Sequence, residues 1–265
     1  MSSALFNAFG PDPDDLLRCL SRHVDDDMLE EIAAADYGHD IEQHLVQLRR
    51  IRDEGSFETP MDWHPIEVLE LIRWSKPEDP KQQPSALGER GHWVRAFACA
   101  ALLRASAAIE IRHLRNDLNE ILIQLINGLC FLGSALDGPA SAFLAWLNLV
   151  FEPDPNAEEI DFLVVGLLWF GLRLRPAVPD EIIISLAEWV AVREQQTAQE
   201  CGRYTGNLQL GSIYGSQSQE AWERLGDALC ALDLGSRSVA AREWVVLIGS
   251  ELAGRKRHVD VERST

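Results

Sequence analysis

ERGHWVRAFACAALLRA, residues 89–105, is the most distinctive stretch of the chain and predicts a helix at the centre of the fold. Its apolar residues recur with the three- and four-residue spacing of one helix face. Arg90, Arg95 and Arg104 occupy other positions of the same helix. An arginine buried beside the apolar face needs a carboxylate partner, because an unpaired buried charge is strongly destabilising. The predicted apolar face consists of Trp93, Phe97, Ala100 or Ala101, and Leu103.

The helical spacing continues in both directions from this segment, and alternating strand-like runs are nearly absent. We expect Asp25 to cap the second helix of the chain and Gly55 to end the third. Short connections make neighbouring helices antiparallel. Upstream we predict a helix opened by Asp12-Pro13-Asp14, then helices over residues 25–35, 39–53 and 64–74. Downstream we predict helices over residues 92–106, 114–135, 139–151, 158–174, 179–199, 217–232 and 236–253.

The fold class that follows is all-α. It is either an irregular multi-helix bundle or a degenerate HEAT-like stack of antiparallel helix pairs. Tryptophans recur in mid-helix without a fixed period, which slightly favours the irregular bundle. The exception is the Gly- and Ser-rich segment 201–218, where we predict a small hairpin near residues 203–214 or an ordered surface loop.

The clearest break is the proline-rich segment Ser75–Gly91. We place a domain boundary there. Residues 1–85 would form an acidic helical N-terminal part that either docks on the rest or stands apart, and residues 86–265 the main helical domain. The predicted core residues of that domain are Trp93, Phe97, Leu125, Leu129, Phe143, Trp146, Leu163, Leu167, Leu186, Trp189, Leu225 and Leu229.

The net charge of −18 is the strongest global signal. A field of this sign repels phosphate backbones and anionic lipid heads, so we expect no general binding to nucleic acid or membranes. It attracts basic protein partners. The 19 acidic and 8 basic side chains of residues 1–85 give that part a net charge of −11. Most of the acidic excess therefore lies in the first third of the chain.

Helix capping explains only one or two of these carboxylates. The remainder cluster in two short stretches, residues 25–31 and 36–42. We therefore predict one exposed acidic face that meets a basic partner. Its residues are Asp26, Asp27, Glu30, Glu31, Asp36, Asp40 and Glu42.

No catalytic, cofactor or metal motif stands out. His39, Asp40, Glu42 and His44 are clustered, but the two histidines are five residues apart and face different ways, so a solvated helix face explains them better than zinc. GxSxG, GxxxxGK and GxGxxG motifs are absent. We therefore predict no catalytic residue, no bound cofactor and no metal ligand.

Several features favour a cytoplasmic location. The five cysteines are odd in number, widely separated and without a CxxC pair, as suits a reducing compartment. The N-terminus has neither a basic region nor a long apolar stretch, so we expect no signal peptide. The most apolar segment, Phe162–Leu172, is far shorter than the ~20 residues of a membrane-spanning helix.

In its overall character, and in GHWVRAFACAALLRA (residues 91–105), the chain resembles the helical immunity proteins of bacterial polymorphic-toxin systems. This resemblance implies a non-enzymatic inhibitor that sequesters one cognate toxin. If the toxin is a basic nuclease, the acidic first third would mimic its nucleic-acid substrate.

Two alternatives stay open. A helical-repeat adaptor would bind a partner peptide in a regular concave groove. A helical enzyme acting on a small molecule would need a deep pocket with convergent polar groups.

Overall fold

The protein is described from a computed structural model, which covers residues 12–34, 42–55, 90–106, 115–153, 161–201, 226–235, 239 and 241–248. Throughout these residues the regular elements are helices and no strand occurs, which confirms the all-α class. The predicted helix over residues 64–74 and the predicted hairpin near 203–214 lie outside the described residues.

The chain divides into two compact units, Met1–Phe151 and Glu152–Thr265. The predicted boundary between residues 85 and 86 lies outside the described residues, so it stays a prediction there. Helices from both sides of that position belong to the first unit. The described helices within residues 1–85 thus pack against helices that lie after residue 89.

The first unit contains six described α-helices and one short 3-10 helix. They are α2 (Asp15–Ser21), α3 (Asp26–Ala34), α4 (Glu42–Glu54), α6 (Arg90–Ser106), α7 (Arg115–Leu132), η2 (Ser134–Leu136) and α8 (Asp137–Val150). Gly55, which follows α4, has a φ of 60° and ends the helix as predicted, because the left-handed conformation strongly favours glycine.

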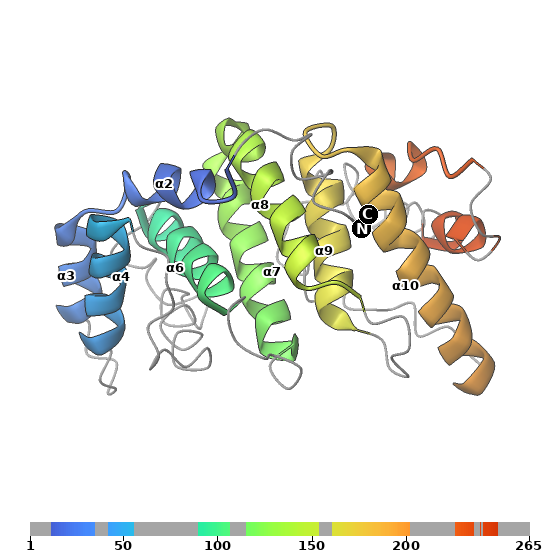
Figure 1. Cartoon of the computed structure of the whole chain (residues 1–265), viewed down its shortest axis with the longest axis horizontal. Helices are drawn as coiled ribbons and strands as arrows, with labels where there is room; N and C mark the ends of the chain where they lie inside the picture. Colours follow the sequence, from blue (N-terminus) through green and yellow to red (C-terminus); the bar gives the residue numbers. More distant parts are fainter. Residues whose placement is uncertain are drawn as a thin grey trace, which may run out of the picture. The chain divides into compact units, whose positions relative to one another are not determined.

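Helix α6 is the centre of the first unit, as predicted. It packs against α2, α3, α4 and α7, and Figure 1 shows it between the α3–α4 pair and α7. The prediction of a single apolar face is wrong, because every residue from Ala96 to Leu103 is buried. Neighbouring helices cover α6 on several sides, and its small residues allow them to approach closely.

Helix α7 approaches α6 closely at Gly128. A Cβ atom built on Gly128 of α7 would lie 3.2 Å from Cβ of Ala96. Such a separation is tighter than ordinary van der Waals contact. A larger residue at position 128 would therefore push the two central helices apart.

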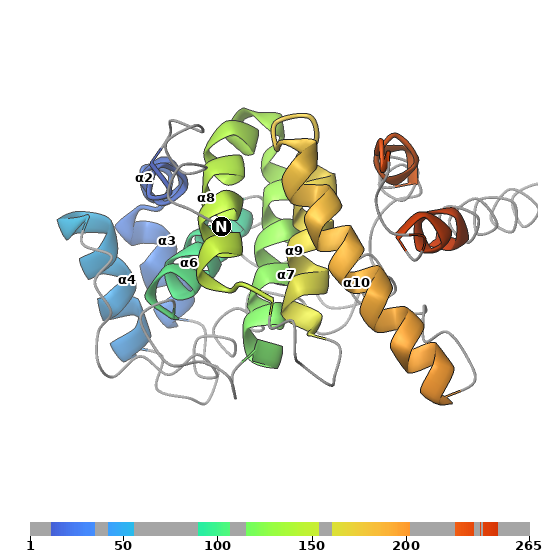
Figure 2. The ribbon, with the colours of Figure 1, turned by 45° about the vertical axis from the view of Figure 1, so that its right-hand side comes forward.

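Helix α2 lies across α6 and α8 (Figures 1 and 2). The helix has only seven residues, yet Leu16, Leu17 and Leu20 are completely buried. Burying side chains of this size stabilises a fold by roughly 1.5–3 kcal/mol each. Apolar packing therefore fixes the first described helix onto the centre of the unit.

The second unit contains α9 (Phe162–Leu174) and α10 (Asp180–Cys201), which pack against each other. Residues 226–230 and 241–248 are also helical. The rings of Trp169 in α9 and Trp244 have centroids 6.3 Å apart. Arg175, which follows α9, connects the start of α10 to the segment after residues 226–230. It pairs with Asp180 at 2.8 Å and donates a hydrogen bond to the carbonyl of Ala231 at 3.0 Å.

The predicted core is largely confirmed. Trp93 and Trp189 are half-buried, which suits a ring whose size makes complete burial rare. Leu225 lies outside the described residues. The predicted core residues found buried are Phe97, Leu125, Leu129, Phe143, Trp146, Leu163, Leu167, Leu186 and Leu229.

Candidate functional site

Helix α3 carries most of the predicted acidic face, and Asp25 begins it. The backbone N–H of Met28 donates to Oδ1 of Asp25 at 2.8 Å, so Asp25 caps the helix as predicted. Asp26 and Asp27 follow in the first turn. Negative charge is favourable there because the helix dipole is positive at its N-terminus.

The apolar stripe of α3 consists of Met28, Leu29 and Ile32, all of them buried. Helix periodicity places Asp26, Asp27, Glu30 and Glu31 away from this stripe, and all four are exposed. Asp27 and Glu30 are three residues apart and lie next to each other, opposite the buried stripe. Asp26 and Glu31 lie on either side of them, toward the neighbouring helices.

Arginines of α4 hold the side of α3 that carries Asp26. Nη2 of Arg52 donates to Oδ1 of Asp26 at 2.9 Å, and Nε of Arg49 lies 3.7 Å from the same oxygen. Arg52 also contacts Asp53 at 2.7 Å, and its side chain is only 13% exposed. Hydrogen bonds to Asp53, then to Asp26, raise the pKa of Arg52. The guanidinium thus remains charged between α3 and α4.

Arg90, the first residue of α6, holds the opposite side of α3. Its Nη1 lies 3.3 Å from Oε1 of Glu31, and its Nη2 lies 3.2 Å from Oδ1 of Asp25. Close by, the ring of His23, which lies in the turn before α3, stacks on that of Trp93 in α6 with centroids 3.9 Å apart. One arginine therefore connects the start of α6 to the N-cap residue and to the middle of α3.

Asp27 and Glu30 differ from these held carboxylates. Within the part of the chain that the structure describes, neither makes an ion pair or a side-chain hydrogen bond, and both are exposed. We call these two residues the α3 edge. It is a pair of adjacent carboxylates on a helix that arginines hold from both sides.

The remaining predicted partner-binding residues are Asp36, Asp40 and Glu42. Glu42 is exposed at the start of α4, and its Oε1 lies 3.7 Å from Nη1 of Arg49. Asp36 and Asp40 lie outside the described residues. Whether the seven residues form one continuous face stays a prediction.

From the sequence, the predicted partner-binding carboxylates have no structural role beyond helix capping, and this is wrong for three of them. Asp26, Glu31 and Glu42 have arginine partners within the first unit. Sequence reasoning did not identify these arginines as partners of the acidic residues. The group Arg49, Arg50 and Arg52 could have indicated them, because it places three positive charges within four residues of a strongly acidic segment.

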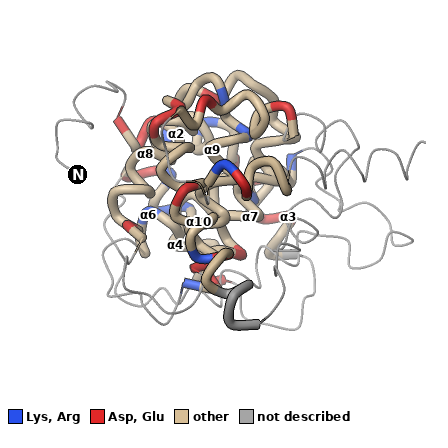
Figure 3. The backbone as a smooth tube through the Cα atoms, turned by 90° about the vertical axis from the view of Figure 1, so that its right-hand side faces the viewer, with Lys and Arg blue, Asp and Glu red and all other residues tan. Residues whose placement is uncertain are grey.

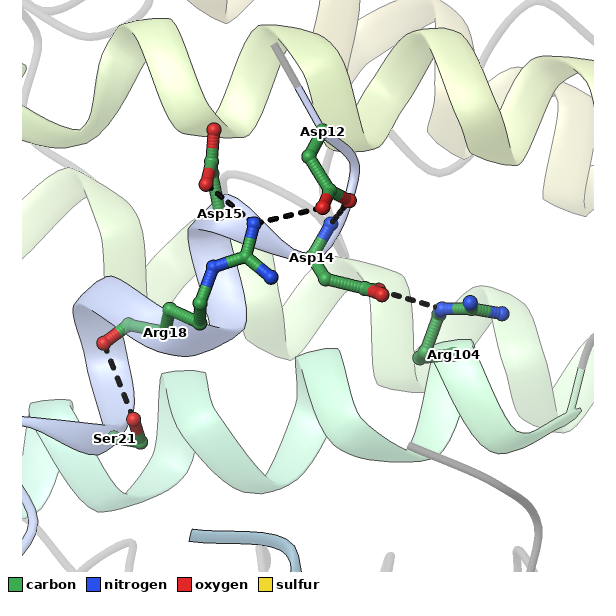
Figure 4. Close-up of polar contacts among 6 residues, drawn as sticks. All are labelled: Asp12, Asp14, Asp15, Arg18, Ser21 and Arg104. Carbon is green, nitrogen blue, oxygen red and sulfur yellow. Dashed lines mark hydrogen bonds and ion pairs between the residues drawn. The ribbon is translucent and has the colours of Figure 1, made fainter. Parts of the chain in front are cut away.

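A second charged cluster joins α2 to α6 and is shown in Figure 4. Nε of Arg104 donates to Oδ1 of Asp14 at 2.7 Å, so this partly buried arginine has a carboxylate partner. Arg18 pairs with Asp12 at 2.9 Å and with Asp15 at 2.6 Å. The backbone N–H of Asp14 and then Arg18 hold the pKa of Asp12 below its usual value. This cluster is structural, because its contacts join parts of one unit.

Charged residues of both signs occur on the described helices (Figure 3). Among the described residues, no group of three or more His, Cys, Asp and Glu side chains could hold a metal ion. His44, one of the two clustered histidines, is buried, while His39 and Asp40 lie outside the described residues.

Within the described residues no single helix is long and apolar enough to cross a membrane. One bent pair, Arg115–Leu132 with Ser134–Val150, satisfies the length and composition at an angle of 119°.

Comparisons with protein-family models, with curated proteins and with solved structures find no match to this chain.

Proposed function

We propose that this chain is a non-enzymatic protein-binding module that sequesters a basic protein partner, as the helical immunity proteins sequester toxins. The observation that carries the proposal is the α3 edge. Asp27 and Glu30 are adjacent, exposed and without a cation in the described residues, whereas Asp26 and Glu31 of the same helix and Glu42 of α4 are paired. An unneutralised pair of carboxylates in a strongly acidic region is suited to accept basic side chains.

The arginines on either side of α3 make the edge a better binding surface. Arg52 and Arg90 connect α3 to α4 and α6, and the buried Leu29 anchors it to the core. The helix is therefore held in one orientation before a partner arrives. A surface that is already ordered loses less entropy on binding, so more of the interaction energy appears as affinity.

The same arginines restrict which partners fit. Arg50 is 58% exposed on α4, and Arg49 lies nearer α3. A partner with a broad basic surface would bring positive charge close to these arginines, and like charges across an interface are costly. The complementary partner therefore has a narrow row of basic side chains. The Cβ atoms of residues three apart on a helix lie ~5–6 Å apart, and the basic side chains of the partner must match this spacing.

The net charge of −11 on residues 1–85 acts over a longer distance. It attracts a basic partner during diffusion and so raises the association rate, most strongly at low salt. Contact with the α3 edge then selects the bound orientation. Because the two carboxylates of the α3 edge lie where the partner docks, they contribute more to the association rate than equally charged carboxylates elsewhere on the chain.

The proposal is tested by capturing the partner from the native host with the full-length chain and identifying it by mass spectrometry. The purified partner is then titrated against the wild type, the variant Asp27→Asn/Glu30→Gln, and the control Glu181→Gln/Asp227→Asn. The control removes two exposed carboxylates of the second unit, so both variants change the net charge equally.

We expect the α3-edge variant to bind the partner at least tenfold more weakly than the control. Equal dissociation constants for the two variants would refute the role of the α3 edge. A partner without any basic surface would refute the proposed function itself.

A further inference from the structure

We draw no further inference here: the strongest candidate, the outward apolar surface of the helical segment near the end of the second unit, where Val239, Val246 and Leu247 are exposed, carries none because nothing in the described residues shows what covers it.

Discussion

Arg104 of α6 donates a hydrogen bond to the carboxylate of Asp14, with 2.7 Å between Nε and Oδ1, and so ties the start of α2 to the central helix. The guanidinium also lies 4.8 Å from the ring centroid of Trp146 in α8. One side chain thus joins three helices of the first unit. The pair is partly buried, with 30% of the Arg104 side chain and 19% of the Asp14 side chain exposed.

Replacing Arg104 with alanine should therefore destabilise the protein. The substitution leaves the Asp14 carboxylate partly buried without its charged donor, and losing such a bond costs about 1.5–3 kcal/mol. The matched control is Arg50→Ala, whose pair with Glu54 is more than half exposed on both sides. Pairs of that kind contribute less than about 1 kcal/mol. Urea unfolding of both variants checks the prediction, and an equal loss of stability would contradict it.

The close approach of α6 and α7 predicts a strong effect of size at position 128. Gly128→Leu should cost about 1–3 kcal/mol, because the added side chain meets Ala96 and overpacks the centre of the unit. Gly138→Leu is the control, since a Cβ at Gly138 in α8 has no neighbour within 4 Å. Thermal unfolding followed by circular dichroism compares the two. A lower melting temperature for the Gly138 variant would show that the helix contact is assigned wrongly.

The ion pair of the second unit predicts a dependence of stability on pH. Hydrogen bonds from Arg175 hold the pKa of Asp180 below its usual value. At acid pH the unfolded chain therefore binds this proton more readily than the folded one. The stabilisation is fully present above the unfolded pKa of about 4 and is lost as the pH falls through the lower folded value.

Free energies of unfolding, measured at several pH values from neutral to acid, test this expectation. Asp180→Asn should be less stable than the wild type at neutral pH, and the difference should shrink on acidification. Asp227→Asn, an exposed carboxylate of the same unit that makes no described ion pair, serves as the control. A constant difference at every pH would mean that Asp180 contributes nothing through its charge.

Burial of its apolar stripe, more than its ion pairs, should stabilise α3. Leu29→Ala removes a completely buried side chain and should cost about 2–5 kcal/mol. Arg90→Ala breaks only exposed contacts and should cost less than about 1 kcal/mol. Val46→Ala, at a half-exposed position of α4, is the control for loss of an aliphatic side chain. A larger loss of stability from Arg90→Ala than from Leu29→Ala would reverse this assignment.

Local features of the fold were predictable from the sequence because their causes are local. The cap at Asp25, the end of α4 at Gly55 and the buried stripe of α3 each depend on residues a few positions apart. The central position of α6 was also predictable, since few segments contain so many small apolar residues. Its burial on several sides was not, because that depends on which other helices surround it.

The arginine partners of α3 were unpredictable for the same reason. Arg52 is 26 residues from Asp26, and Arg90 is 65 residues from Asp25. With 42 acidic and 24 basic residues in the chain, composition allows a very large number of pairings. Only the packing of α3 against α4 and α6 selects among them. This selection also separates the α3 edge from carboxylates that look equivalent in the sequence.

The rate at which the captured partner associates, at low and at high salt, is the most direct test of the α3 edge. The variant Asp27→Asn/Glu30→Gln should keep a melting temperature within a few degrees of the wild type, because surface substitutions usually change stability by less than about 0.5 kcal/mol each. It should associate more slowly at low salt and depend less on salt than both the wild type and the control Glu181→Gln/Asp227→Asn. Identical rates and identical salt dependence for the three proteins would contradict the account and remove the α3 edge from partner recognition.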